Sequence, residues 1–136
     1  MWGREVTLKA FEILYTLLGT KFDYYFFESD TAVSGKKIVE EGLKNGVFEN
    51  SDGAVVFHGE KYDPTLHTRV FVNSQGLPTY EAKELGLTKK KFDVENPDLS
   101  IVTTAVEQKE YMRVVLKAVE ILYPEYSGKI MHINHG

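Results

Sequence analysis

Residues 99–104 read Leu-Ser-Ile-Val-Thr-Thr, residues 107–123 read Glu-Gln-Lys-Glu-Tyr-Met-Arg-Val-Val-Leu-Lys-Ala-Val-Glu-Ile-Leu-Tyr, and residues 130–133 read Ile-Met-His-Ile. The first and last runs are short and rich in β-branched residues, which is typical of strands. The middle run has apolar residues at helical spacing. A strand, a helix and a strand over about 35 residues predict a βαβ crossover and therefore an α/β fold with a parallel sheet.

Polar residues follow both predicted strands. Gln108 lies just past the end of the first strand, and His135 and Gly136 lie at the end of the second. Ligands of open parallel sheets bind outside the carboxyl ends of the strands. We therefore expect ligand chemistry at this edge.

A helix start precedes this unit, in residues 76–84, Gly-Leu-Pro-Thr-Tyr-Glu-Ala-Lys-Glu. Pro78 favours an extended conformation for the residue before it. Thr79 is a suitable cap for a short helix that begins at Tyr80, and Gly86 is suited to end that helix. Residues four apart share a helix face, so this helix presents a phenol and a carboxylate together.

The remaining elements follow from the same patterns. The apolar stripe of residues 6–18 predicts an amphipathic helix. The aromatic run 22–27 predicts a strand or a buried extended segment, rather than a platform for stacking bases. A second helix over residues 35–45 with Ser34 as its cap, a hairpin over residues 46–58 and a strand over residues 69–73 complete the prediction.

The composition fits one soluble globular unit. The chain has 136 residues, of which 43% are hydrophobic and 26% are charged, which is enough to bury a core. A net charge of −4 gives no basic field of the kind that marks nucleic-acid binding, and the lack of cysteine excludes disulfides and thiolate metal sites. No apolar run approaches the roughly 20 residues that span a bilayer, and a signal-peptide layout is absent. We therefore expect a cytoplasmic protein without membrane contact.

Several motifs occur together in one order. Taken with their predicted secondary structure, they resemble the class I arginyl-tRNA synthetases over most of the chain. The motifs are Phe22-Asp23, Glu28-Ser29, a hairpin with Asp52-Gly53, the strip 75–84 with Thr79-Tyr80, Asn96-Pro97-Asp98, Ala105-Val106-Glu107-Gln108 and the run 132–136 from His to Gly.

The resemblance implies an arginine site. The tyrosine and the acidic residue with which the family contacts L-arginine fall on Tyr80 and Glu84, and the glutamine that helps to hold the amino acid falls on Gln108. A guanidinium is a planar fork of donors, and a carboxylate accepts two of them. The chemistry of these side chains suits that ligand.

The resemblance also implies an ATP edge. The family's His-to-Gly strand borders the adenine, which implies that His132, His135 and Gly136 lie near ATP. In a complete enzyme of this family, ATP is a substrate, Mg²⁺ is expected with it, and tRNA(Arg) is the acceptor.

Two features depart from the family pattern. Glu84 stands where the family usually has Asp, and Lys83 stands where it usually has Arg. No segment resembles His-Ile-Gly-His or Lys-Met-Ser-Lys-Ser, the motifs that stabilise charge during adenylate formation. We therefore assign no catalytic residue, and we expect an interior fragment of the catalytic domain that is inactive alone.

The resemblance further implies two segments. Residues 1–73 would form an α+β insertion that contains the hairpin, between the halves of a Rossmann-like fold, and residues 74–136 would form the βαβ start of its second half. An unpaired sheet edge in such a piece favours self-association.

Other interpretations of the same residues stay open. Tyr80 and Glu84 also fit an ordinary exposed helix face, and Gln108 fits a solvated helix start. His132 and His135 fit a zinc site poorly because they point to opposite faces of a strand. Residues 89–91, three lysines, fit a solvated face or a contact with tRNA phosphates. The alternative function is a small α/β module that binds a ligand or regulates without catalysis.

Overall fold

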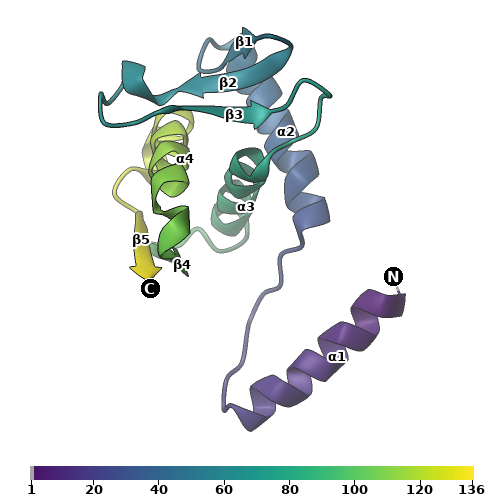
Figure 1. Ribbon diagram of the computed structural model, residues 1–136. Helices are drawn as coiled ribbons and strands as arrows, with labels where there is room; N and C mark the ends of the chain where they lie inside the picture. Colours follow the sequence, from purple (N-terminus) through teal and green to yellow (C-terminus); the bar gives the residue numbers. More distant parts are fainter. Residues whose placement is uncertain (1) are drawn as a thin grey trace.

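The computed structural model describes residues 2–136 (Figure 1). The helices are α1 (Trp2–Leu17), α2 (Glu28–Lys44), α3 (Tyr80–Glu95) and α4 (Lys109–Leu122). The strands are β1 (Glu49–Ser51), β2 (Ala54–His58), β3 (Thr68–Val72), β4 (Ser100–Ala105) and β5 (Ile130–His135). Three short 3-10 turns, η1 (Gly59–Lys61), η2 (Val106–Gln108) and η3 (Pro124–Tyr126), connect them.

Two small sheets lie at opposite ends of a layer of three helices (Figure 1). Strands β1, β2 and β3 form an antiparallel sheet in that order, and its first turn has Asp52 and Gly53 at positive φ angles of 48° and 80°. Strands β4 and β5 are parallel, from the pair Ser100 and Ile130 to the pair Ala105 and His135. Both the predicted hairpin and the predicted βαβ crossover, and with them the α/β fold class, are confirmed.

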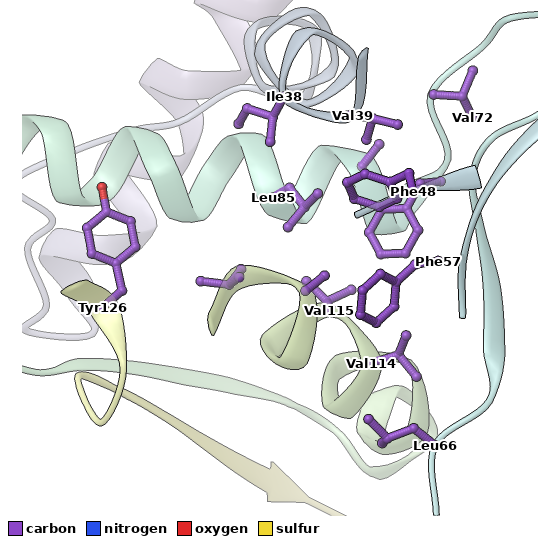
Figure 2. Close-up of a cluster of buried hydrophobic side chains, with 14 of the residues drawn as sticks. Ile38, Val39, Phe48, Phe57, Leu66, Val72, Leu85, Val114, Val115 and Tyr126 are labelled. Atoms are coloured by element: carbon purple, nitrogen blue, oxygen red, sulfur yellow. The ribbon is translucent and has the colours of Figure 1, made fainter. Parts of the chain in front are cut away.

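The core lies between the antiparallel sheet and helices α2, α3 and α4 (Figure 2). Phe48, Phe57 and Phe71 pack against one another with ring centroids 5.0 to 6.1 Å apart. Leu85 of α3 and Val115 of α4 are fully buried in the same cluster. Full burial of a side chain of this size stabilises a fold by about 1.5–3 kcal/mol, so this cluster fixes the relative positions of the helices.

Helices α2 and α3 cross at two glycines that bring their backbones into contact. A Cβ added at Gly35 of α2 would lie 1.9 Å from the carbonyl oxygen of Ala82. A Cβ added at Gly86 of α3 would lie 2.2 Å from the carbonyl oxygen of Thr31. No side chain fits between the helices at these positions, so the crossing requires glycine on both sides.

The prediction that Gly86 ends the helix from Tyr80 is wrong. Helix α3 continues to Glu95 and ends at Asn96, which has a left-handed φ of 44°. Gly86 is buried in the helix interior, where its missing side chain allows the close approach of α2. A glycine within a helical pattern can therefore mark a helix crossing instead of a helix end.

The predicted start of the second helix is also wrong. Helix α2 begins at Glu28 rather than at residue 35, and Ser34 lies inside it. The Ser34 hydroxyl donates to the carbonyl oxygens of Asp30 and Thr31, each at 3.2 Å, so it caps nothing. Glu28 and Asp30 in the first turn favour this earlier start, because carboxylates stabilise a helix N-terminus.

The predictions for the N-terminal residues are only partly correct. Residues 2–17 form the expected helix, but α1 buries none of its residues and lies apart from the other helices (Figure 1). Residues 22–27 form neither a strand nor a core segment. They connect α1 to α2, and Tyr24 and Tyr25 are exposed.

Two predictions on organisation stay predictions. The proposed division between residues 73 and 74 falls just after β3, and α2 packs against α3 across it. Self-association through the edges of the two-stranded sheet is likewise untested. Within residues 2–136, no helix is both long enough and apolar enough to cross a membrane.

We expect Gly86→Ala to destabilise the fold. The added methyl group would force α2 and α3 apart, and this strain outweighs the roughly 1 kcal/mol by which alanine favours a helix over glycine. The expected net loss is about 2 kcal/mol, measured by urea denaturation. Gly3→Ala is the control, because a Cβ at Gly3 meets nothing within 4 Å. An unchanged stability of Gly86→Ala would show that the helices can separate freely.

Candidate binding site

The turn between β3 and α3 is held by the side chain of Asn73. Its Oδ1 accepts hydrogen bonds from the backbone N–H groups of Gln75 and Leu77, both at 3.0 Å. Gly76 adopts a φ of 76° in this turn, a conformation that glycine reaches without strain. The loop before the helix therefore has a defined shape.

Hydrogen bonds from Thr79 connect the start of α3 to strand β3. Thr79 occupies the cap position, as predicted, but its hydroxyl makes no capping bond. Instead the hydroxyl donates to the carbonyl oxygens of Val70 at 2.8 Å and Phe71 at 3.1 Å. These bonds fix the direction in which α3 leaves β3, and with it the position of Tyr80.

A hollow of about 200 Å³ lies where α2, α3 and α4 meet. Tyr80 and Glu84 both line it, which confirms the prediction that they share one helix face. The hollow opens to solvent beside Tyr80, which is 71% exposed. Its lining residues are Glu28 and Thr31 of α2, Tyr80, Lys83, Glu84 and Leu87 of α3, and Tyr111 of α4.

Glu84 is the most unusual group in the hollow. Its Oε1 is buried and has no hydrogen-bond partner among the residues that the structure describes. Burial raises the pKa of this carboxyl group, and the positive charge of Lys91 opposes the shift. A buried carboxylate without a partner is destabilising, so this side chain is poised to accept a ligand donor.

The other charges of the hollow are already paired. The Lys83 ammonium forms an ion pair with the carboxylate of Glu28 and lies 4.8 Å from the centroid of the Tyr80 ring. These two opposite charges balance each other. The ionised form of Glu84 therefore leaves the hollow with an excess negative charge, which favours a cation.

A second hollow of about 210 Å³ lies beside the first. Two of its lining residues, Arg69 and Glu81, form an ion pair with an Nη1 to Oε1 distance of 3.4 Å. Its lining residues are Arg69 of β3, Tyr80 and Glu81 of α3, Glu107 and Gln108 of η2, and Tyr111 of α4. The structure thus brings Gln108 close to Tyr80, but Gln108 and Glu84 line different hollows.

The three predicted ATP residues lie outside both hollows. His132 is half-buried on β5, and its Nε2 lies 2.7 Å from the hydroxyl of Thr104 on β4. Burial lowers the pKa of His132. His135 and Gly136 are exposed at the carboxyl end of β5, which contacts η2, the turn that carries Gln108. The strand ends and the second hollow therefore adjoin each other.

The sequence does not identify most residues that line the two hollows, and four of these are Glu28, Thr31, Arg69 and Tyr111. Glu28 and Thr31 were not expected there, because the start of α2 was placed too late. Arg69 was assigned only to a strand. Tyr111 belongs to the predicted apolar stripe of its helix. It also lies three residues after Gln108, a spacing that places both side chains on the same face of a helical segment.

Residues 2–136 contain no group of three or more His, Asp or Glu side chains that could hold a metal ion. The nearest pairing of histidine with carboxylates is at the edge of the antiparallel sheet. There His58 contacts Glu49 at 3.1 Å and Glu60 at 3.3 Å, and Lys61 also pairs with Glu49. This cluster is a set of surface ion pairs.

Residues 7–136 match the family described as class I tRNA synthetases (R), catalytic domain. The chain belongs to this family. The resemblance to class I arginyl-tRNA synthetases that the motifs indicated is therefore confirmed.

Relatives within the arginyl-tRNA synthetase family agree with this assignment. The arginine–tRNA ligases of Amoebophilus asiaticus and Flavobacterium psychrophilum are each 28% identical to the chain over 128 residues, which is 93% of the chain and 21% of the relative. The arginine–tRNA ligase of Clostridium perfringens is 28% identical over 138 residues, covering 100% of the chain and 24% of the relative. The chain thus spans about a fifth to a quarter of the length of these relatives.

Two crystal structures share the fold. The arginyl-tRNA synthetase of Plasmodium falciparum superposes with a TM-score of 0.78 at 20% identity, over 97% of this chain and 23% of that chain. A Campylobacter jejuni protein described as an arginyl-tRNA synthetase gives a TM-score of 0.81 at 16% identity, over 98% of this chain and 29% of that chain. The arrangement of helices and sheets is therefore that of an arginyl-tRNA synthetase segment.

We expect Glu84→Gln to stabilise the chain at pH 7. Because burial raises the folded-state pKa of Glu84, the folded state binds the proton more tightly than the unfolded chain. The wild-type stability therefore falls as the pH rises from about 4, the unfolded-state value for glutamate, through the folded-state pKa. The variant does not lose stability in this way. Its free energy of unfolding should therefore exceed that of the wild type at pH 7 and equal it below about pH 4.

Urea denaturation at several pH values measures this difference. Glu125→Gln is the matched control, because Glu125 is exposed in η3 and should give no such pH-dependent gain. A lower stability of Glu84→Gln at pH 7 would mean that the carboxylate has a favourable partner in the folded chain.

Proposed function

We propose that this chain supplies the arginine-binding face of an arginine–tRNA ligase, in which Tyr80, Glu84 and Gln108 hold L-arginine. One observation carries the proposal. One oxygen of the Glu84 carboxylate, Oε1, is buried without a hydrogen-bond partner in a hollow where Lys83 and Glu28 already form an ion pair. A bound guanidinium would provide that partner.

The chemistry of the hollow favours a guanidinium over similar groups. Arginine presents five N–H donors in a rigid plane, so it can bond to the Glu84 carboxylate while its face lies against the Tyr80 ring. L-Citrulline has nearly the same shape but no charge, and it would leave the carboxylate uncompensated. L-Lysine offers a single ammonium group without the planar fork.

The ATP site is proposed at the carboxyl ends of β4 and β5. His135 and Gly136 border it, since ligands of parallel sheets bind at this edge and Gln108 lies in the turn that contacts β5. His132 lies within β5, and its place near ATP is implied by the family resemblance alone. This arrangement would place the amino acid beside the nucleotide. In the complete ligase, Mg²⁺ would accompany the ATP.

The complete reaction activates L-arginine with ATP and transfers it to tRNA(Arg). We assign that reaction to the whole ligase, because the chain spans only about a fifth of the relatives named for it. The residues of this chain bind and orient the substrate. In the cell such a ligase would work in the cytoplasm.

Calorimetric titration with L-arginine, L-citrulline and L-lysine tests the arginine site. We expect the affinity for L-arginine to exceed that for L-citrulline by at least about 10-fold, since a hydrogen bond to a charged group contributes about 1.5–3 kcal/mol. Glu84→Gln should remove this preference, and Glu125→Gln should keep it. Equal responses to the three amino acids, or none to L-arginine at millimolar concentration, would exclude the proposed site.

Chemical-shift mapping with ATP tests the nucleotide edge. We expect the largest changes at the backbone amides of His135 and Gly136 and in the η2 turn, because these residues adjoin at the carboxyl ends of the two strands. The exposed amides of α1 serve as the internal control. Changes spread evenly over α1 and the strand ends would contradict a nucleotide site at this edge.

A further inference from the structure

Helix α1 carries a row of exposed apolar side chains, which we call the α1 stripe. Its members are four or seven residues apart, a spacing that places them on one face of a helix. They are Trp2, Val6, Ile13 and Leu17, and the two end members are 79% and 78% exposed. Contiguous apolar surface of this kind marks an interaction site in soluble proteins.

The opposite face of α1 is held by residues 22–27. The ring of Tyr15 meets that of Phe22 edge-on, with the ring centroids 4.7 Å apart. The Arg4 guanidinium carbon lies 4.4 Å from the centroid of the Phe27 ring. Tyr15 and Arg4 are on the side of the helix away from the stripe. These contacts fix α1 apart from the other helices with its stripe turned outward (Figure 1).

The sheet of β4 and β5 has one apolar face that is also exposed, which we call the outer face. Side chains alternate between half-buried and exposed along both strands, and Ile130 of the half-buried set packs against the core. The outer face is formed by two register pairs, Ile101 with Met131 and Thr103 with Ile133. Parallel sheets are usually covered on both faces, so this sheet lacks one of its layers.

The chain exposes more surface than a compact monomer of its mass. Its solvent-accessible surface is 8682 Å², which is about 1,500 Å² more than the roughly 7,200 Å² expected of a folded chain of 15.5 kDa. A stable protein–protein interface covers about 800 Å² on each partner. The surplus therefore corresponds to about two such contacts per chain.

The charges of the two surfaces allow two copies of the chain to meet. The whole chain has a net charge of −4, which opposes association. Helix α1 itself has equal numbers of basic and acidic residues, Arg4 and Lys9 against Glu5 and Glu12. The four side chains of the outer face are uncharged. A contact between α1 and the outer face therefore brings no excess of like charge together.

We propose that two copies of this chain associate by exchanging α1, so that the α1 stripe of each copy covers the outer face of the other. Each copy has both surfaces, and a two-fold axis therefore closes the pair with two identical contacts. The exchanged helix gives the parallel sheet its second layer, on the side opposite α4. The occupant is a second copy, because residues 22–27 hold α1 away from the sheet of its own chain. The pairing is independent of the proposed arginine site.

Light scattering over a range of concentrations tests the association. We expect a mass twice the 15.5 kDa of one chain, with a dissociation constant of about 10 µM or lower, as is usual for interfaces of this size. Leu17→Glu and Ile133→Glu should each weaken the association at least about 100-fold. The reason is that each substitution removes an apolar contact twice in the symmetric pair, and each loss weakens binding about 10-fold or more.

Val33→Glu is the matched control. Val33 is 74% exposed on α2 and belongs to neither surface, so this variant should associate like the wild type. Leu17 and Ile133 are likewise exposed in the single chain, and circular dichroism should show that all three variants are folded. Hydrogen exchange is a second measurement, because pairing should slow the exchange of α1 amides that are unprotected in the single chain.

A mixing experiment tests the exchange itself. Leu17→Glu has an intact outer face, and Ile133→Glu has an intact α1 stripe. Their mixture should form a mixed pair in which one of the two contacts is native. We expect this mixed pair to be at least about 10-fold tighter than either variant paired with itself.

The other outcomes each overturn the proposal. A chain that stays monomeric at millimolar concentration leaves both surfaces to other occupants. Unchanged association of Leu17→Glu would indicate pairing through strand edges, and unchanged association of Ile133→Glu would indicate pairing of α1 with α1. Weakened association of both variants without recovery in the mixture would exclude the exchange of helices.

Discussion

The contact between the backbones of α2 and α3 is the constraint on which the rest of the structure depends. Gly35 and Gly86 face carbonyl groups of the opposite helix at distances that exclude any side chain. This crossing fixes the N-terminal turn of α2 beside the first two turns of α3, so residues from both line the same hollow. Helix α4 then closes the hollow with Tyr111, because Val115 and Leu85 share one core.

The core and the candidate site have opposite effects on the stability of the fold. The aromatic cluster of Phe48, Phe57 and Phe71 stabilises the fold through burial. Glu84 opposes folding, because its Oε1 is buried without a hydrogen-bond partner. Groups of this kind persist in proteins where a ligand completes them. The same fold thus combines a well-packed core with one buried carboxylate oxygen that has no hydrogen-bond partner among the described residues.

The sequence predicted regular elements better than contacts between elements. The βαβ unit was correct because its signals, β-branched runs and helical spacing, are local. Gly86 was misread because helix ends and helix crossings both select glycine, and only the position of α2 distinguishes them. The aromatic residues 22–27 were misread because hydrophobicity does not specify what covers a segment. Tyr80 and Glu84 were grouped correctly by helical spacing, but Tyr111 and Arg69 reach the site through tertiary packing that no local pattern encodes.

Helix α1 buries none of its residues, and this has a consequence for how the chain unfolds. An isolated helix of this length is marginally stable in water, so the amides of α1 should exchange with solvent at nearly the rate of a free peptide. Exchange in α2 and α3 reports instead on the cooperative unit that includes the core. Opening of α1 therefore breaks contacts with residues 22–27, such as that between Arg4 and Phe27, and leaves the core between α2, α3 and α4 in place.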